Sequence, residues 1–569
     1  MRPVAVFAAL AIAVVLTAPR AGATAHAAAP TVSGYPSAQT IKPSGPLPAG
    51  AGSAVALNTA IGEQEDAVLV VAGARRVAVA APTLIGPLPV RLFFAHFVRF
   101  GGKLVPDALF PWDGSARQTE QPNQPIWLQV TVPYGTMPGT YTGVLGVSVD
   151  AATTLVHLTV HVFDVTLPRP GQLSGSLMTS FLLSAQTYVN AVAREENFTQ
   201  GEQYRSANVS LYRFLASYRI APSSWGYGDP IDLHGYTSSG KWWLDAAGNM
   251  IQVVGGHNFA PMRLPISNNR TTARNYIAGL SPDAPERWCD YLKAIRGFWG
   301  MYGWLDALPY VYGQDEPGLA GFRLVARQAA ALHTCFPGGK ELVTGNPSRN
   351  NQFLWDGRGG DDVDIWTVVA NRYYGEFTVP RQQRLHHSRA REKLALLDTA
   401  RSRGAQIWVY TYPGTHTPGF DASEPLSDGR MLFLWSALEG IQGVLYAENL
   451  TAYGKDDPLT SVGNDGAFVL VYPGAAGPMP SARLEQIRDG IEDWELLAIV
   501  RARHGAATVR RILGDAGLFS ASASGVKLAC TIGCDLHGST PFSWPSYSHD
   551  VTTAARIERA KLAALTAAR

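Results

Sequence analysis

Charged residues are scarce in this chain of 569 residues, at 16% of the total, and the formal net charge is only +2. Proteins that bind nucleic acid through its phosphates carry a basic patch, and acidic interaction tails need a block of like charges. This composition favours neither class. Hydrophobic residues reach 46%, which excludes a largely disordered chain, and the length predicts about two to four domains with large cores.

Cysteine is also scarce, with four residues: Cys289, Cys335, Cys530 and Cys534. Neither pair has zinc-site spacing and no His lies at a metal-ligand interval, so we predict no metal. An even count permits disulfides if the protein is exported. Cys530 and Cys534 could close a small loop, whereas Cys289 and Cys335 lie on or near two predicted helices and could be buried thiols.

Several catalytic signatures are absent. The sequence contains no Gly-x-Ser-x-Gly elbow, no Walker-type Gly-Lys-Ser/Thr and no glycine-rich dinucleotide turn. These absences disfavour a serine hydrolase and a nucleotide-dependent enzyme. We predict no cofactor.

Long apolar runs are lacking except at the N-terminus. Arg2 precedes a nearly continuous apolar run over 4–18, and small residues around Ala23 and Ala25 offer a cleavage site. The run is short for a membrane span, so we predict a signal peptide over 1–28 and a secreted or extracellular protein, with cell-surface association as an option. An uncleaved anchor is the alternative.

Residues 30–168 are predicted to form a β-sandwich. Short β-branched runs at 67–71, 77–79, 126–132 and 155–162 are separated by Pro/Gly turns. The run at 126–132 alternates between two faces, as expected where one face is buried. A proline-rich stretch at 167–171 marks the end of this domain.

Residues 169–505 are predicted to form a (β/α)₈ TIM-like barrel. We expect strands at 177–182, 219–223, 260–265, 310–313, 341–344, 364–369, 406–410 and 443–446, and helices at 201–218, 285–301, 321–332, 382–403 and 428–438. Eight strands with intervening helices fit the length of such a barrel. The link between the second and third strands shows little helical character, so an open doubly wound sheet remains the alternative.

The C-terminal part is predicted to be helical. Apolar residues recur at helical spacing over 481–497, and the acidic residues between them are interpreted as salt-bridged charges on a docking helix. A second amphipathic helix is expected at 552–569. Residues 506–569 would thus form a helical extension that includes the Cys530/Cys534 loop.

The most informative residues are Asp315 and Glu316, which follow the fourth predicted barrel strand. Alone, Asp-Glu-Pro-Gly is also ordinary turn chemistry. Active sites of such barrels, however, form at the carboxyl ends of the strands, where carboxylates beside aromatic rings suit acid catalysis on a sugar. We therefore predict that Asp315 and Glu316 are catalytic. The predicted substrate-binding residues are Tyr312, Trp366, Asn371, Tyr374, Trp408, Tyr410, Tyr446 and Glu448. For Trp366, Trp408, Tyr410 and Tyr446, packing inside the barrel is an equal alternative, since inward strand positions are normally bulky.

Several of these segments together resemble glycoside hydrolase family 123. They are 310–317 (Tyr-Val-Tyr-Gly-Gln-Asp-Glu-Pro), 363–366, 407–410, 443–446, 471–474 and above all 488–494 (Arg-Asp-Gly-Ile-Glu-Asp-Trp). Residues 124–133 and 138–141 are similar to the family's N-terminal domain. The resemblance runs from about residue 60 to 503.

The resemblance implies an exported, retaining glycoside hydrolase that removes terminal β-linked N-acetylhexosamine, most often N-acetylgalactosamine, by substrate-assisted catalysis. Glu316 would be the general acid/base, and Asp315 would hold the 2-acetamido group of the substrate, whose carbonyl oxygen attacks the anomeric carbon. The implied partner is a glycan with a terminal N-acetylhexosamine, with no nucleic acid and no membrane beyond the signal segment. Ala447 follows Tyr446 where many relatives carry Trp, which leaves the sugar preference open.

Two alternatives stay open. The same fold could serve a carbohydrate-binding or cell-surface protein without turnover, because aromatic residues suit both functions. A glycosidase of different sugar specificity could use a remote carboxylate, Asp428 or Glu448, as its nucleophile.

Overall fold

The computed structural model describes most of the chain. The described residues are 29–170 (apart from 51, 81–82 and 85), 177–181, 202–222, 262–263, single positions from 289 to 300, 308–355, 363–370, 373, 383–412, 418–446, 450–519 with short gaps, and 552–569. The predicted signal segment 1–28 and the predicted Cys530/Cys534 loop lie outside them. No described helix is long and apolar enough to cross a membrane.

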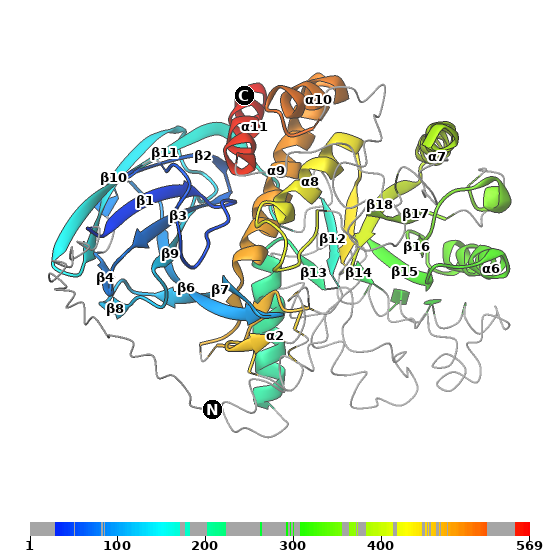
Figure 1. Cartoon of the computed structure of the whole chain (residues 1–569). Coiled ribbons are helices and arrows are strands. Elements are labelled where there is room, and N and C mark those ends of the chain that lie inside the picture. Colours follow the sequence, from blue (N-terminus) through cyan, green and yellow to red (C-terminus); the bar gives the residue numbers. More distant parts are fainter. Residues whose placement is uncertain are drawn as a thin grey trace, which may run out of the picture.

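The N-terminal part is a sandwich of two sheets (Figure 1). One sheet has the order β1-β3-β9-β6-β20, with β7 on β6, and the other has the order β2-β11-β10-β4-β8, with β5 on β10. The bounds are β1 Thr31–Pro36, β2 Ala54–Ile61, β3 Gln64–Ala72, β4 Arg76–Val79, β5 Thr83–Leu84, β6 Val90–Phe100, β7 Lys103–Trp112, β8 Arg117–Gln118, β9 Asn123–Thr131, β10 Gly139–Val149, β11 Ala152–Thr166 and β20 Ser461–Val462.

The alternation predicted for 126–132 places Ile126, Leu128 and Val130 in the sandwich core, but the expected exposed face of β9 is buried as well: Trp127 lies in a second apolar cluster and Gln129 donates to Glu485. Strand β11 has one buried face. Val156, Leu158, Val160 and Val162 of β11 are buried, and their neighbours along the strand are more exposed. Such alternation is what a sheet with one buried face requires. The strand β20 was not predicted: it comes from far along the chain and pairs in parallel with β6.

The second part is built on a curled parallel sheet with the order β13-β12-β19-β18-β17-β16-β15-β14. All eight strands predicted from the sequence are confirmed: β12 Met178–Phe181, β13 Ala221–Pro222, β14 Met262–Arg263, β15 Pro309–Gln314, β16 Lys340–Thr344, β17 Ile365–Val369, β18 Gln406–Thr411 and β19 Gly443–Tyr446. Every pairing in this sheet is parallel.

Neighbouring strands of this curled sheet mostly follow one another along the chain. From β15 to β19, each strand pairs with the strand that precedes it along the chain, and β19 also pairs with β12. Within the described residues the one neighbouring pair that does not hydrogen-bond is β13 and β14. An open doubly wound sheet does not show this return of the last strand to the first.

Helices cover the outer face of this sheet (Figure 1). They are α2 Glu202–Ser217, α6 Leu319–Cys335, the 3₁₀ helix η1 Arg349–Leu354, α7 Gln383–Ser402 and α8 Asp428–Glu439. The helix predicted at 285–301 falls on residues of which the structure describes only single positions. Because both faces of the sheet are covered, its strands are almost continuously buried, as is typical of parallel sheets.

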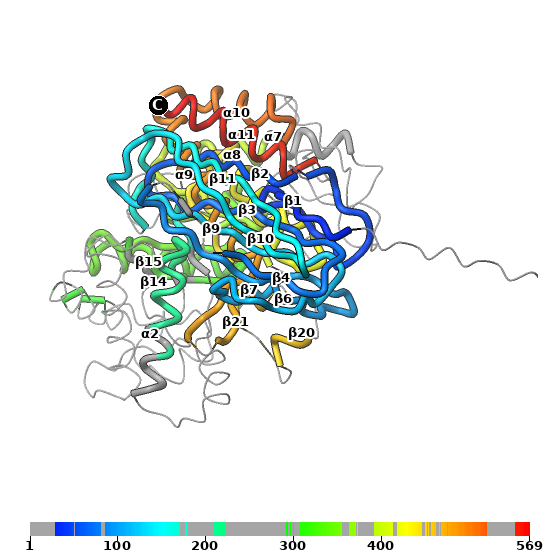
Figure 2. Tube along the Cα trace, turned by 90° about the vertical axis from the view of Figure 1, so that its left-hand side faces the viewer, coloured from blue at the N-terminus to red at the C-terminus, as the bar shows by residue number. Residues whose placement is uncertain are grey.

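Helix α9 (Ala482–His504) runs between the sandwich and the parallel sheet (Figure 1), and it begins where Ser481 accepts a hydrogen bond from the Leu484 amide. A short hairpin of β21 Val471–Tyr472 and β22 Met479–Pro480 precedes it. Helices α10 (Ala506–Asp515) and α11 (Thr553–Ala567) follow, and α11 packs against β1, β2 and β11 (Figure 2). The chain thus returns to its N-terminal sandwich at its C-terminal end.

Charged side chains of α9 hold the two parts together, as the docking-helix interpretation expected. On the sandwich side, Arg488 donates to Asp66 of β3 at 2.8 Å and Arg483 donates to Asp107 of β7 at 2.7 Å. A buried charge is tolerated only when it is paired and hydrogen-bonded, and these pairs meet that condition.

The other side of α9 uses the same chemistry. Arg219, just before β13, donates to Glu492 at 3.1 Å, and Arg430 of α8 donates to Asp493 at 2.7 Å. Lys561 of α11 adds ion pairs to Glu63 and Glu65 of the sandwich. The charges are therefore paired and buried between elements, in agreement with the salt-bridged docking helix that the sequence predicted.

Carboxyl groups outnumber cations in this buried network, which raises their proton affinity. Burial raises the pKa of Glu485 to about 8, with Arg488 opposing the shift and Asp66 adding to it. Burial and the neighbouring Asp66 likewise raise the pKa of Asp489 to about 7. Both shifts follow from the cost of a charged carboxylate in a low-dielectric interior.

Candidate active site

Strand β15 positions the two carboxylates. Its inward side chains Tyr310 and Tyr312 pack with Leu342, Ile365 and Trp408 of the neighbouring strands. The register with β16 shifts between Tyr312 and Gln314, which marks an irregularity just before the strand ends. Asp315 and Glu316 follow immediately and both are exposed to solvent at the carboxyl edge of the sheet.

Glu316 has a left-handed backbone, with φ of 40°. This region is uncommon for a residue other than glycine and costs on the order of 1 to 3 kcal/mol. Successive side chains of a regular strand point to opposite faces. The turn at Glu316 breaks that alternation, so Asp315 and Glu316 both contact side chains from the inner face of the sheet.

One oxygen of Asp315 is held by two hydroxyl groups. Tyr312 donates to Oδ1 at 2.7 Å, and Thr344, the last residue of β16, donates to the same atom at 2.9 Å. The other oxygen, Oδ2, makes no hydrogen bond to a described residue. The carboxylate is therefore fixed through one oxygen, and the other has no hydrogen-bond partner among the described residues.

Glu316 is held in a similar way. Its backbone amide donates to Thr344 Oγ1 at 2.7 Å, and its Oε1 accepts a hydrogen bond from the Tyr410 hydroxyl. Burial, and then the Glu316 carboxylate, raise the pKa of Tyr410 well above its ordinary value. The phenol therefore stays protonated and acts as a donor at any physiological pH.

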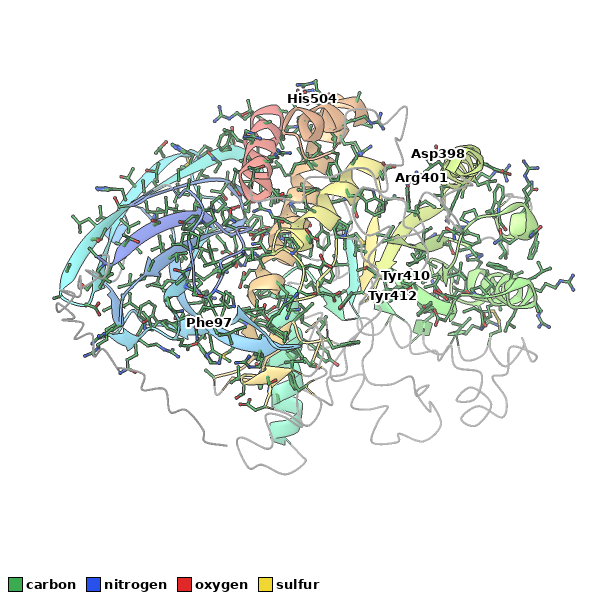
Figure 3. The ribbon with its side chains drawn as sticks, in the orientation of Figure 1. Phe97, Asp398, Arg401, Tyr410, Tyr412 and His504 are labelled. Carbon is green, nitrogen blue, oxygen red and sulfur yellow. A yellow bond between two sulfur atoms is a disulfide. The ribbon has the colours of Figure 1, made fainter. Side chains whose placement is uncertain are left out.

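Tyr410 and Tyr412 provide an aromatic surface beside Glu316. Figure 3 shows them together where β18 ends, and their ring centroids are 6.1 Å apart at an interplanar angle of 27°. Tyr410 is buried and Tyr412 is half-buried. The predicted site residues Asp315, Glu316, Tyr312 and Tyr410 are thus brought together from two strands.

Trp408 faces inwards but lies one layer below the carboxylates. It is fully buried, its Nε1 donates to Gln406 at 3.0 Å, and its ring meets Tyr310 edge-on at 5.8 Å. A Cβ atom on its register partner Gly443 would lie 2.3 Å from the indole, so glycine there makes room for the ring. This placement fits a core residue of the sheet interior and not the sugar-binding role predicted for it.

Trp366 and Tyr446 do not join the site. Trp366 lies on the outer face of the sheet, where its ring is 6.2 Å from Phe322 of α6. Tyr446 lies in the same helix-side core, 4.9 Å from the Phe420 ring. Both are fully buried away from the carboxylates, so the sugar-binding prediction for these two residues is corrected: they pack helices onto the sheet.

The remaining predictions fall outside the described residues. Asn371, Tyr374 and Glu448 all lie there, so their substrate-binding roles stay predictions. Asp428, named as an alternative nucleophile, is fully buried in the first turn of α8. That position does not suit attack on a substrate.

Thr344 is the residue that sequence reasoning missed. The strand end was predicted, but a threonine that closes a β-branched strand carries no signal of its own. Strand topology could have identified it, because neighbouring parallel strands bring their carboxyl ends to one edge of the sheet. Thr344 and the end of β15 are neighbours for that reason.

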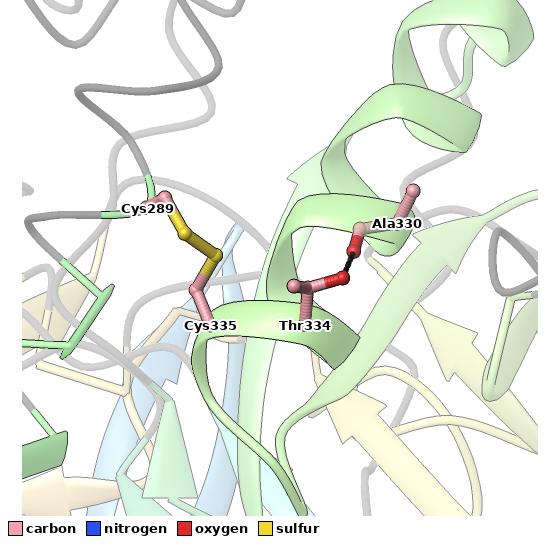
Figure 4. Close-up of a disulfide and its surroundings, with 4 residues drawn as sticks. All are labelled: Cys289, Ala330, Thr334 and Cys335. Atoms are coloured by element: carbon pink, nitrogen blue, oxygen red, sulfur yellow. Dashed lines mark hydrogen bonds between the residues drawn. A yellow bond between two sulfur atoms is a disulfide. The ribbon is translucent and has the colours of Figure 1, made fainter.

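The segment after the carboxylates is fixed by a disulfide that the sequence left undecided. Cys289 bonds to Cys335 at the end of α6, the helix that begins three residues after Glu316 (Figure 4).

Within the described part of the chain, no group of three or more His, Cys, Asp or Glu residues could hold a metal ion.

The chain was compared with protein-family models and with curated proteins. Residues 241–500 match the model described as the glycoside hydrolase 123 catalytic domain. No curated protein matches the chain.

Solved structures were compared as well. A family 123 glycoside hydrolase from Clostridium perfringens, studied for glycolipid glycan hydrolysis, is similar with a TM-score of 0.67 at 12% identity, covering 95% of this chain and 98% of that one. A putative alpha-galactosidase from Bacteroides fragilis matches at 8% identity with a TM-score of 0.29, over 78% of this chain and 77% of that one, which is too low to carry an argument.

The structural match extends over the sandwich and the parallel sheet, and the family model spans the residues that hold Asp315, Glu316 and helix α9. The resemblance inferred from the sequence is thereby confirmed: residues 241–500 of this chain form a glycoside hydrolase family 123 catalytic domain, and the chain has the fold of a family 123 enzyme.

Proposed function

We propose that this protein is an exported, retaining glycoside hydrolase that removes terminal β-linked N-acetylhexosamine by substrate-assisted catalysis, with N-acetylgalactosamine as the first sugar to test. One observation carries the proposal. In each of the adjacent carboxyl groups Asp315 and Glu316, one oxygen is held by protein hydroxyls, and the other has no described partner. Two carboxyl oxygens without a described partner, Asp315 Oδ2 and Glu316 Oε2, thus lie at the carboxyl edge of the parallel sheet.

Glu316 supplies the proton in the first step. With Oε1 held by Tyr410, Oε2 carries the proton and donates it to the glycosidic oxygen as the C1–O bond breaks. The carbonyl oxygen of the substrate's 2-acetamido group forms the new bond to C1, giving a cyclic oxazolinium intermediate. The substrate therefore supplies the nucleophile, an exception to the usual pair of enzyme carboxylates.

Asp315 orients that nucleophile. Its free Oδ2 accepts the N–H of the acetamido group, which turns the carbonyl oxygen towards C1 and stabilises the positive charge that develops on nitrogen. In the second step Glu316 takes a proton from water, the water oxygen bonds to C1, and the carbonyl–C1 bond breaks. Two displacements at C1 give overall retention of configuration.

The surrounding architecture is part of the same proposal. We infer that the curled sheet closes as a (β/α)₈ barrel over 169–505, between a sandwich at 30–168 and a helical extension at 506–569. The strand order supports this inference, because the sheet already returns from β19 to β12.

Export is inferred from two features. An apolar N-terminal segment precedes the sandwich, and the Cys289–Cys335 disulfide suits an oxidising compartment. Expression of the full gene, followed by mass determination of protein recovered from the medium, tests this. A mature protein that begins near residue 29 supports export, whereas full-length protein retained in the cell contradicts it.

Activity is tested with aryl β-N-acetylgalactosaminide, β-N-acetylglucosaminide and β-galactoside, using wild type, Glu316→Gln and Asp315→Asn. We expect cleavage of an N-acetylhexosaminide only, and a loss of about 10²-fold or more in both variants, the range typical of a removed acid/base group. Tyr373→Phe, which alters a buried hydroxyl on the helix side of the sheet, is the matched control. Wild-type turnover that survives in Glu316→Gln contradicts the acid assignment, and cleavage of none of the three favours a binding protein.

A further inference from the structure

Among the described residues, the hydroxyl of Thr344 is the side-chain group that hydrogen-bonds to both Asp315 and Glu316. It donates to Asp315 Oδ1 at 2.9 Å and accepts from the Glu316 amide at 2.7 Å. A threonine hydroxyl has one proton to give and two lone pairs to receive, so it can make both bonds at once. Tyr312 and Tyr410 each reach only one carboxyl group of the pair.

Thr344 is held rigidly by its surroundings. It is the last residue of β16, it is 1% exposed, and its register partner on β17 is Thr367. A β-branched side chain on a strand has little freedom about its first torsion. The direction of the hydroxyl is therefore set by the sheet and not by the loop that carries the carboxylates.

The loop needs such a support. Glu316 precedes Pro317, and a residue before proline prefers an extended backbone. Its left-handed φ of 40° is thus opposed by local preference and must be imposed by tertiary contacts. The hydrogen bond from the Glu316 amide to Thr344 is the contact that acts directly on this backbone.

We propose that Thr344 is the positioning residue of this site: its hydroxyl fixes the left-handed turn at Glu316 and the orientation of Asp315, so that both free carboxyl oxygens face one substrate. As a statement about catalysis, this rests on the proposed function. As a statement about geometry, it stands on the hydrogen bonds alone. Thr344 itself need not touch the substrate.

Three variants of the full chain test the proposal. Thr344→Val keeps the shape of the side chain and removes both hydrogen bonds, and Thr344→Ser restores the hydroxyl. Thr367→Val is the matched control, because Thr367 is a fully buried threonine in register with Thr344 whose hydroxyl has no partner among the described residues. Melting temperatures of all three establish that they are folded.

Kinetics with an aryl β-N-acetylhexosaminide separate positioning from general damage. We expect Thr344→Val to lower kcat about 30- to 100-fold with KM changed less than about threefold, as when an interaction matters in the transition state only. Thr344→Ser and Thr367→Val should stay within about threefold of wild type. Inhibition by a thiazoline analogue of the cyclised intermediate should weaken in Thr344→Val by about the same factor as kcat/KM falls.

Crystal structures of Thr344→Val and Thr344→Ser provide a test that does not depend on activity. We expect Glu316 to leave the left-handed region and Asp315 to turn away in Thr344→Val, and neither to change in Thr344→Ser. If wild type cleaves no N-acetylhexosaminide, the proposed function fails and these structures alone decide the positioning role. An unchanged carboxylate pair in Thr344→Val overturns the inference, as does equal loss of kcat in Thr344→Ser or Thr367→Val.

Discussion

The buried carboxyl groups along α9 predict that this protein loses stability as the pH rises. Glu485 and Asp489 have pKa values raised to about 8 and about 7, chiefly by burial between the sandwich and the parallel sheet. In the unfolded chain they titrate near pH 4. At pH 6 the native protein therefore holds about two protons that the unfolded chain has released.

The sign follows from this difference. Because the folded pKa values are raised, the stability contributed by these groups is fully present below about pH 4 and is lost as the pH rises through 7 and 8. Glu492, whose pKa is also raised by burial, acts in the same direction. Burial lowers the pKa of Lys561, which acts in the opposite direction at the alkaline end.

The magnitude can be worked out for Glu485 and Asp489. Two protons change the free energy of unfolding by about 2.7 kcal/mol per pH unit. For a chain of 569 residues unfolding as one unit, the entropy of unfolding is on the order of 1.2 kcal/mol/K. The melting temperature should therefore fall by about 2 °C per unit between pH 5.5 and 7, and by more if a smaller part unfolds first.

Differential scanning calorimetry from pH 5.5 to 8.5 at constant ionic strength measures this slope. The double variant Glu485→Gln/Asp489→Asn should reduce the slope of melting temperature against pH by the contribution of about two protons, or about 2 °C per pH unit. Asp515→Asn, at an exposed position of α10, should leave this slope unchanged. A melting temperature that is constant or rises over this range in wild type would refute the reasoning.

Three further perturbations have defined outcomes. Gly443→Ala places a Cβ atom 2.3 Å from the Trp408 ring, so it should lower the melting temperature and reduce the free energy of unfolding by about 2 to 4 kcal/mol. Gly139→Ala, with open space around it, should reduce the free energy of unfolding by less than about 1 kcal/mol. Equal effects of the two substitutions would contradict the packing of Gly443 against Trp408. Reduction of Cys289–Cys335, which spans 46 residues, should lower the free energy of unfolding by roughly 4 kcal/mol in urea titrations, and a Cys289→Ser/Cys335→Ser variant should show the same loss without reductant, whereas an unchanged variant would contradict this contribution. Tyr410→Phe removes the donor to Glu316 Oε1 and should lower kcat/KM for an aryl N-acetylhexosaminide about tenfold, the worth of one hydrogen bond to a charged group, whereas unchanged kinetics would remove Tyr410 from the site.

Much of the fold could be predicted because its strands carry local signals. Six of the eight parallel strands contain β-branched or aromatic residues, and all eight were located from the sequence, although β13 (Ala-Pro) and β14 (Met-Arg) lack such residues. Two-residue β20 could not be found in this way, since a pairing with β6 more than 360 residues away is a tertiary contact without a local pattern.

The site was predictable only in part. Asp315 and Glu316 stand out because they end a strand, but the inward or outward direction of Trp366, Trp408 and Tyr446 could not be read from the sequence. A parallel sheet is covered on both faces, so hydrophobicity does not distinguish the face that lines the interior from the face that meets the helices. Thr344 escaped notice because its partners lie 28 and 29 residues away along the chain.

The most direct test of the central claim is whether the substrate's own amide attacks the anomeric carbon. Aryl β-N-acetylhexosaminides with one, two or three fluorine atoms on the acetyl group make the carbonyl oxygen progressively less nucleophilic and leave the leaving group unchanged. We predict that kcat/KM falls steeply along this series, by about 10²-fold or more in total, which is about 2.7 kcal/mol or more of barrier. A kcat/KM that does not depend on fluorination would show that a protein group or water attacks instead, and would contradict the roles assigned to Asp315 and Glu316.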